Sequence, residues 1–266
     1  MRSMWTAATG MKAQQFNIDT ISHNLSNVNT TAYKRNRAEF QDLFYANIRR
    51  MNQLDERKRP VNLEVGHGTQ PVATKRDFST YSFIDSGSPT DLALQGEGFF
   101  CISDRRGEEV YTRDGSFKLS MLDDGTANLV TSDGNYVLSA NGDRINFDPS
   151  VGDLVFSLDG RISQKITGTD QMDEITSLKL VRFPNPQALE ARGRNLYART
   201  INSGGPVALT EANSTTSVLQ NYLEMSNVQI VDEMVKMITA QRAYEINSKA
   251  ITTSDEMLQT ANGLKR

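Results

Sequence analysis

Cysteine and histidine are scarce in this sequence of 266 residues. The single cysteine, Cys101, excludes an internal disulfide. Together with His23 and His67 it falls short of the roughly four ligands that a structural zinc ion needs. We therefore expect neither a metal nor a cofactor.

Long apolar runs are missing as well. No stretch approaches the ~18 consecutive apolar residues that would span a bilayer, so we expect no membrane insertion. The opening MRSMWTAATGMKAQQ lacks a continuous apolar stretch, so no cleavable secretory signal is expected. The net charge of −3 argues against a protein whose main ligand is nucleic acid.

Glycine and proline are absent from most of both ends. Of the 18 glycines, only Gly10 and Gly263 lie outside the range 66–205, and all seven prolines lie between Pro60 and Pro206. Because both residue types interrupt helices, their absence favours long helices within 11–59 and 207–262.

The middle of the chain has a different pattern. Asp-Gly or Asn-Gly pairs begin at Asp114, Asp124, Asp133 and Asn141, at spacings of ten, nine and eight residues. These pairs supply the positive φ angles of tight hairpin turns, and short alternating apolar runs separate them. Turn signals at this spacing predict an antiparallel all-β domain.

Apolar residues at both ends repeat every seven residues, the period that packs one helix along another. At the C-terminal end, Ala240, Ala243, Ala250 and Ala261 are small enough to allow a close helix approach. The residues expected on subunit-packing helix faces are Met4, Met11, Ile18, Ile21, Leu25, Val28, Leu223, Ile230, Met237, Tyr244, Ile251 and Leu258.

Two arrangements of these helices are open. Two amphipathic helices lying on the β domain are the commoner arrangement among proteins in general. The pattern here persists over about four heptads or more, however, and a helix of 30 to 40 residues reaches roughly 45 to 60 Å. A β domain rarely offers a face of that length, so the favoured partner of each helix is the other helix, followed by further copies of the chain.

No catalytic motif stands out, and no catalytic residue is predicted. Gly96-Glu97-Gly98 lacks the third glycine and the following helix of a dinucleotide fingerprint. No G-x-S-x-G sequence supports Ser22 as a nucleophile. An enzyme would need a pocket with converging polar groups, and that alternative is open to an activity screen.

Charge is distributed unevenly along the chain. Residues 1–59 hold ten Lys or Arg against five Asp or Glu, while the remainder holds 19 basic against 27 acidic residues. A nucleic-acid surface would need this basic region to face outward with stacking aromatics. Attraction between the basic N-terminal region and acidic surfaces on neighbouring copies is the simpler interpretation.

Several motifs resemble one family. SHNLSNVNTT at 22–31, followed by Tyr33-Lys34, closely resembles the N-terminal signature of the bacterial flagellar rod and hook proteins. LEMSNV at 223–228, continuing through MVKMITAQRAYEINSKAITTSDEML, is similar to the family's C-terminal signature. The internal motifs SGSPTDLALQGEGFF, YTRDGSF and FPNPQALEARGRNLY are most similar to those of the rod members.

The resemblance implies an α+β fold in which long N- and C-terminal α-helices pair as an inner helical domain, with a central antiparallel all-β domain outside. The implied division is an N-terminal helix in 1–44, a connecting rod-type segment in 45–65, a β-rich outer domain in 66–216 and a C-terminal helix in 217–266. One departure is Asn221, which stands where the family usually has glycine in the bend before the C-terminal helix.

The resemblance also implies a structural subunit without catalysis. The expected partners are further copies of the chain in a helical homopolymer, neighbouring rod proteins, the hook protein, the surrounding ring proteins and the flagellar export apparatus. The expected location is the rod within the periplasm, and another rod member of similar size is the alternative identity. Within the rod-type segment, Arg49, Arg50, Arg57 and Arg59 are expected to contact acidic neighbours.

Overall fold

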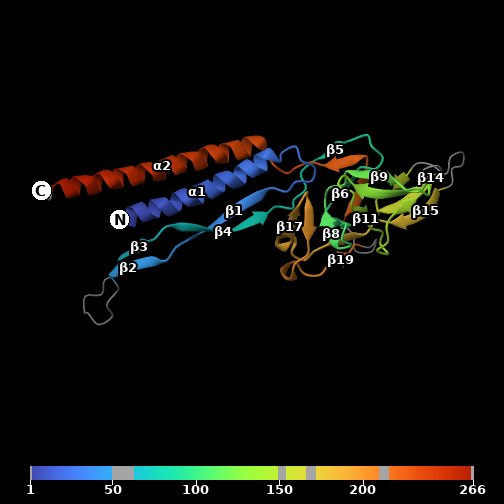
Figure 1. Ribbon diagram of the computed structural model, residues 1–266, viewed down its shortest axis with the longest axis horizontal. Coiled ribbons are helices and arrows are strands. Elements are labelled where there is room, and N and C mark those ends of the chain that lie inside the picture. Colours follow the sequence, from blue (N-terminus) through green and yellow to red (C-terminus); the bar gives the residue numbers. More distant parts are fainter. Residues whose placement is uncertain (1, 50–62, 149–153, 166–171, 210–215, 265–266) are drawn as a thin grey trace. The chain divides into compact units, whose positions relative to one another are not determined.

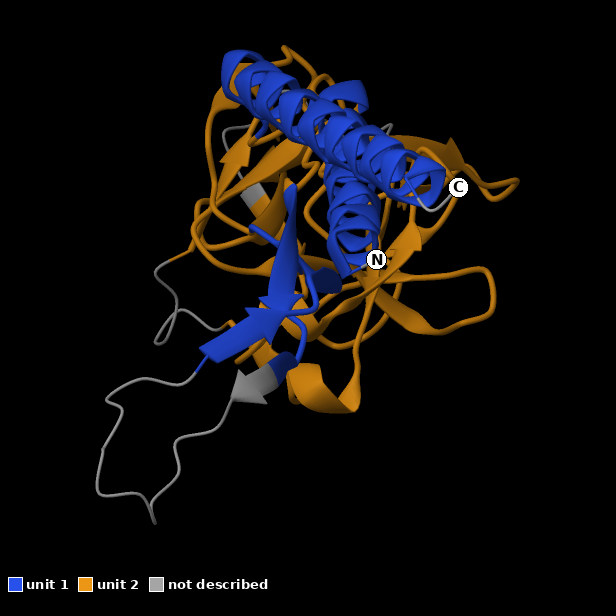
Figure 2. Cartoon of the chain, turned by 90° about the vertical axis from the view of Figure 1, so that its left-hand side faces the viewer, with its two compact units in different colours: residues 1–26, 36–77, 228–266 blue, residues 27–35, 78–227 orange. Residues whose placement is uncertain are grey.

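The computed structural model describes residues 2–49, 63–148, 154–165, 172–209 and 216–264. They form two compact units, shown in blue and orange in Figure 2. Unit 1 contains residues 1–26, 36–77 and 228–266, and unit 2 contains residues 27–35 and 78–227.

Unit 1 is built on two helices, α1 (Arg2–Ser26) and α2 (Ile230–Gly263), which lie side by side (Figure 1). They are antiparallel, because Ser3 near the start of α1 meets Ser254 near the end of α2, whereas Asn24 meets Glu233 at the opposite ends. The first turn of α2 carries Asp232 and Glu233, which stabilise the positive end of the helix dipole.

Two β-ribbons complete unit 1. Strand β1 (Asn36–Asp42) pairs antiparallel with β4 (Thr69–Arg76), and β2 (Tyr45–Arg49) pairs with β3 (Leu63–Gly66). Strands β1 and β4 both pack along α1.

The first helix is shorter than the sequence predicted. Helix was expected as far as residue 44, but α1 ends at Ser26 and strand β1 begins at Asn36. In the turn that follows α1, the Thr30 amide and hydroxyl donate to the backbone and side-chain oxygens of Asn27. Ala32 then adopts a positive φ of 53°. Asn and Thr side chains compete with helix by bonding to nearby groups, so the absence of Gly and Pro did not ensure a continuous helix.

The C-terminal helix also begins later than expected. Strands β19 (Val207–Ala208), β20 (Ser217–Gln220) and β21 (Tyr222–Glu224) occupy the region before Ile230. Leu223 therefore lies on a strand and Val28 in the turn after α1, so neither belongs to a helix face.

Unit 2 is antiparallel β structure, as the turn pattern predicted. Its ten-stranded sheet has the main order β12-β10-β11-β7-β8-β18-β17, with β16 pairing β7 and β19, and β9 pairing β10. The strands are β7 (Phe99–Ser103), β8 (Glu109–Thr112), β9 (Phe117–Met121), β10 (Ala127–Thr131), β11 (Tyr136–Val137), β12 (Asn146–Phe147), β16 (Leu180–Arg182), β17 (Glu190–Gly193) and β18 (Leu196–Ala198).

Smaller sheets flank the large one. Strands β13, β14 and β15 form a three-stranded sheet, and β20 and β21 pair with β6 and β5 respectively. Short 3-10 turns η1 and η2 lie in the connections after β16 and β18. The strands of these smaller sheets and the two 3-10 turns are β5 (Phe83–Asp85), β6 (Leu92–Gln95), β13 (Leu154–Phe156), β14 (Arg161–Lys165), β15 (Met172–Ser177), η1 (Pro186–Ala188) and η2 (Ile201–Ser203).

Three of the four predicted Asp-Gly and Asn-Gly turns have the expected geometry, since Gly125, Gly134 and Gly142 have φ between 81° and 88°. The fourth glycine, Gly115, has another role. A Cβ atom there would lie 1.7 Å from the Leu92 carbonyl oxygen, so glycine allows two backbone segments to touch.

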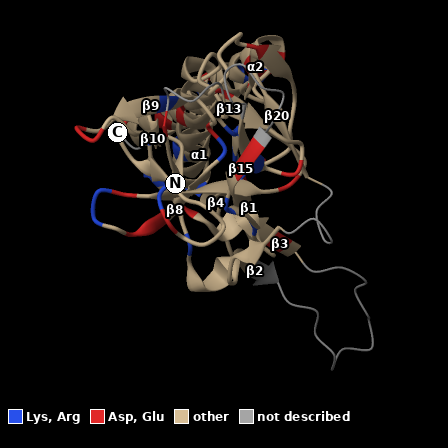
Figure 3. Ribbon diagram, turned by 90° about the vertical axis from the view of Figure 1, so that its right-hand side faces the viewer, with Lys and Arg blue, Asp and Glu red and all other residues tan. Residues whose placement is uncertain are grey.

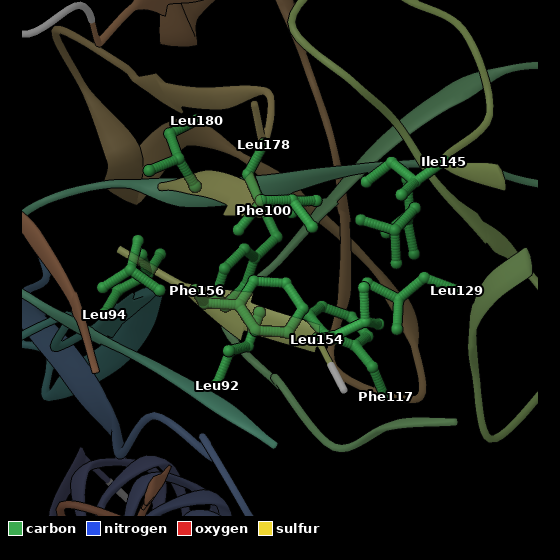
Figure 4. Close-up of a cluster of buried hydrophobic side chains, with 14 of the residues drawn as sticks. Leu92, Leu94, Phe100, Phe117, Leu129, Ile145, Leu154, Phe156, Leu178 and Leu180 are labelled. Carbon is green, nitrogen blue, oxygen red and sulfur yellow. The ribbon is translucent and has the colours of Figure 1, made fainter. Parts of the chain in front are cut away.

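The main core of unit 2 is aliphatic with a few aromatic rings, and Figure 4 shows its side chains converging from several strands. Phe117 and Phe156, expected from the alternation to be core residues, are buried in it. Leu138 is buried in a second cluster, in which Phe99, Tyr111, Phe183 and Tyr197 meet edge to face. Burial on this scale is the main source of stability in unit 2.

Candidate assembly surfaces

Few of the described side chains of α1 and α2 are fully buried. On α1 they are Ala7, Ala13, Ile21 and Asn24, and on α2 they are Glu233 and Ala240. Alanine predominates, and small side chains allow two helix backbones to come close together.

Gly10 marks one point of close approach. A Cβ atom at Gly10 would lie 2.8 Å from Asn247 Nδ2, so alanine there would displace the Asn247 side chain. Gly68, with a φ of 112°, approaches α1 in the same way, because a Cβ atom there would lie 2.0 Å from Thr9 Oγ1. The contact with Asn247 explains why α1 keeps Gly10, although glycine costs about 1 kcal/mol in a helix interior.

The residues predicted for the helix faces occupy mixed environments. On α1, Ile21 is buried, and Met4, Met11, Ile18 and Leu25 are partly buried. On α2, the partly buried residues are Met237 and Ile251, and the exposed residues are Ile230, Tyr244 and Leu258.

A second apolar face on α2 was missed by the seven-residue count. Val231, Met234, Val235 and Ile238 are between 51% and 73% exposed. Their spacing of three, four and seven residues places them on one side of the helix, different from the side of the buried Ala240. The i, i+3, i+4, i+7 pattern is readable in the sequence and could have identified this face. We call these four residues the outer face of α2.

The ribbons of unit 1 also expose apolar side chains. Phe44 is 92% exposed, and Tyr45 and Val72 are each more than half exposed. Of the residues expected to make rod-type contacts, Arg49 is the last residue of β2. Arg50, Arg57 and Arg59 lie outside the described residues.

A buried ion triad joins distant segments of unit 2. Lys34 Nζ lies 2.6 Å from Glu224 Oε1, and Arg113 Nε lies 2.8 Å from Glu224 Oε2. Arg113 also donates to the carbonyl oxygens of Leu94, Gly96 and Gly98. A buried carboxylate is tolerated only with such partners, and Lys34 and Arg113 supply them to Glu224.

Backbone contacts reinforce this junction. The Ala32 amide donates to the Glu224 carbonyl oxygen, and the Arg35 amide donates to Asn227 Oδ1. The N-terminal signature is thereby joined to the C-terminal one, although the separate motifs gave no sign of the contact. Asn221, just before β21, has a φ of 66° and so adopts the left-handed conformation that glycine favours and asparagine tolerates.

Both basic and acidic residues lie along the strands and loops of unit 2 (Figure 3). Arg192 pairs with Glu108 at 2.6 Å, and Arg194 pairs with Asp133 at 3.2 Å.

Inside unit 2, burial raises the pKa of the Cys101 thiol to about 12, so this thiol stays protonated and unreactive near neutral pH. Neither α1 nor α2, over its described length, is apolar enough to cross a membrane.

Three parts of the sequence match known families. Residues 4–34 match the family described as flagella basal body rod protein, and residues 93–164 match the flagellar hook protein FlgE/F/G D1 domain. Residues 219–264 match the flagellar basal body rod FlgEFG protein C-terminal family.

Full-length relatives agree. The flagellar basal-body rod protein FlgG of Borreliella burgdorferi is 45% identical, over 100% of this chain and 99% of that protein. The protein of the same name from Buchnera aphidicola subsp. Schizaphis graminum is 41% identical, over 98% of this chain and 99% of that protein. The one from Caulobacter vibrioides is 39% identical, over 100% of both chains. A solved structure, the Helicobacter pylori flagellar hook protein FlgE2, covers 62% of this chain and 47% of its own at 14% identity, and its TM-score of 0.25 is too low to bear on the fold.

The chain therefore belongs to the flagellar basal-body rod protein family. It is a structural subunit of the distal rod of the bacterial flagellar basal body and not an enzyme, as its motifs predicted.

Proposed function

We propose that the chain polymerises helically and that the polymer carries motor torque to the hook. The observation that supports this most directly is the outer face of α2, where Val231, Met234, Val235 and Ile238 lie open to solvent. A helix of a soluble monomer normally buries its apolar face, and contiguous exposed apolar surface marks an interaction site.

In this proposal the helices of unit 1 form the inner domain of the polymer, and the β structure of unit 2 forms the outer domain. The outer face of α2 and the exposed residues Ile230, Tyr244 and Leu258 of its predicted packing face pack against neighbouring copies. The further partners are neighbouring rod proteins, the hook protein, the surrounding rings and the flagellar export apparatus, with the rod located in the periplasm.

The segment 45–65 has a separate role in the proposal. Its arginines Arg49, Arg50, Arg57 and Arg59 contact acidic surfaces of neighbouring subunits, and the exposed Tyr45 begins the segment. Surface ion pairs are worth only about 0–1 kcal/mol each, but every subunit of a polymer repeats them. We propose that they stiffen the rod.

The test compares two neighbouring substitutions on α2. Ile238→Asp places a carboxylate on the outer face, whereas Thr239→Asp places the same group at an adjacent exposed residue. We expect the parent and Thr239→Asp to form tubular polymers at high concentration in electron micrographs, and Ile238→Asp to stay soluble in a sedimentation assay. Polymers of Ile238→Asp indistinguishable from the parent would contradict a role of this face in assembly.

A further inference from the structure

Three contacts between α1 and α2 follow one rule. The Ser3 and Ser254 hydroxyl oxygens lie 3.2 Å apart. Gly10 faces Asn247, whose Nδ2 atom would lie 2.8 Å from a Cβ at Gly10. Moving from the first contact to the second advances seven residues along α1 and goes back seven along α2.

The third contact lies at the other end of the pair and keeps the same rule. Asn24 Nδ2 donates to Glu233 Oε2 at 3.1 Å, fourteen residues further along α1 and fourteen back along α2 from the Gly10 contact. The intermediate step places Asn17 opposite Ala240, which is 3% exposed.

One seven-residue row of each helix is therefore turned toward the other, and its members are polar or very small. We call this set the polar ladder; it consists of Ser3, Gly10, Asn17 and Asn24 on α1 and Glu233, Ala240, Asn247 and Ser254 on α2.

Apolar side chains pack acceptably in several registers, whereas the bond between Asn24 and Glu233 forms in only one. If α2 shifted by one heptad so that Asn24 faced Ala240, the Asn24 amide would lose its bond to the Glu233 carboxylate. The same shift would place Gly10 opposite Ser254 and leave Asn247 facing Asn17. A single buried polar residue fixes the register of coiled coils by this mechanism.

We propose that the polar ladder sets the register of α1 against α2. The apolar residues of the predicted packing faces contribute contact area without determining the register. The polar ladder leaves the outer face of α2 directed away from α1. This inference concerns a single chain and does not depend on polymerisation. The alternative is that the junction in unit 2, where Asn227 and Tyr33 are hydrogen-bonded, fixes the register by tethering the two helices.

Two cysteine pairs report the register in the purified full-length chain. Ser3→Cys/Ser254→Cys joins residues that face each other, and Ser3→Cys/Ala261→Cys joins residues one heptad out of register. Disulfides form only between Cα atoms within about 7 Å, so the two pairs discriminate well. Cys101 can stay in place because it is fully buried. Intrachain products are separated from dimers by mass on a non-reducing gel.

With the ladder intact, we expect the in-register pair to form its disulfide at least about tenfold faster than the shifted pair, which corresponds to about 1.4 kcal/mol. Adding Glu233→Leu, which leaves the two bonds between Asn24 and the Asn36 backbone in place, should reduce this ratio to within about twofold. The matched control, Gln241→Leu, changes an exposed residue on the same helix and should leave the ratio unchanged.

A second variant guards against loss of folding. Gly10→Ala raises helix propensity, so a weakened α1 would not explain its effect, yet it forces the Asn247 side chain aside. We expect it to lower the ratio of the two disulfide rates by at least about threefold, a smaller effect than that of the first variant. A parental ratio near one, or a ratio that both ladder variants leave unchanged, would overturn the proposal, and the second result would assign the register to the junction.

Discussion

Lys34 and Glu224 form an ion pair of 2.6 Å in which neither side chain is exposed. The two residues are 190 positions apart in the sequence, and each belongs to one of the terminal signature motifs. Arg113 completes the pair from the far side of the carboxylate. The two signatures thus meet in one buried junction in unit 2, where Lys34 follows the end of α1 in the sequence and Glu224 precedes the start of α2.

Removal of the lysine should destabilise unit 2. In Lys34→Met, Glu224 keeps only Arg113 as a cationic partner, and breaking a buried pair costs about 3 kcal/mol or more. Calorimetry should show a lower melting temperature for the β structure. The control Lys118→Met removes an exposed lysine of β9 and should change stability by no more than about 0.5 kcal/mol. Equal melting temperatures for the two variants would contradict a stabilising role of the pair.

Arg113 should be less replaceable still. Its guanidinium bonds to Glu224 and to the carbonyl oxygens of Leu94, Gly96 and Gly98, which a lysine ammonium on a flexible stem cannot reproduce. We expect Arg113→Lys to lose at least about 2 kcal/mol in chemical denaturation, since buried carbonyl groups and a carboxylate would lose donors. A lysine variant as stable as the parent would show that charge alone is sufficient.

Asn221 offers a test of backbone conformation. Because its φ is 66°, Asn221→Gly should change the free energy of unfolding by only a few tenths of a kcal/mol, whereas Asn221→Val should cost about 1–3 kcal/mol in strain. Denaturant titration of the two variants beside the parent measures the difference. Similar losses in both would indicate that the Asn221 side chain, and not its backbone, is what matters.

Cys101 provides a probe of opening in unit 2. Its thiol has a pKa raised to about 12 by burial, and thiol reagents attack the thiolate. At pH 8 we expect a thiol-specific reagent to label the native chain only as fast as the β structure opens, and to label it at once in denaturant. Rapid labelling of the native protein would contradict the closed packing around β7.

The predicted packing face of α2 can be tested in the same chain. Ile251→Asp places a carboxylate at a partly buried residue of α2, where desolvation costs several kcal/mol without a partner. We expect it to block polymer formation in a sedimentation assay while unit 2 melts at its parental temperature. An early-melting unit 2 together with normal polymers would support the alternative of helices lying on the β domain.

The β structure was the most predictable part of the fold. Asp124-Gly125, Asp133-Gly134 and Asn141-Gly142 encode their turns locally, because a positive φ requires particular residues. Asp114-Gly115 has the same composition but serves a contact with Leu92, which depends on a distant segment and cannot be read from four residues.

The helix ends and the helix interface were less predictable. The turn at Asn27–Thr31 depends on side-chain hydrogen bonds that compete with the helix, and composition alone does not show whether the turn or a longer helix forms. The seven-residue count found the correct period but favoured its apolar members, although Asn24, Glu233 and Asn247 face the partner helix. The ion triad was not predicted at all, because nothing near Lys34, Arg113 or Glu224 in the sequence signals a partner so far away.

The length of chain between Lys34 and Glu224 has a consequence for the order of folding. Contacts between residues distant in sequence form late, because the loop between them must close before the contact contributes. When the chain is made from its N-terminal end, Lys34 is present early, whereas Glu224 follows only after most of the β-forming sequence. Closure of the triad is therefore expected among the last steps of folding, so a chain that stops short of Glu224 should stay open and susceptible to proteases.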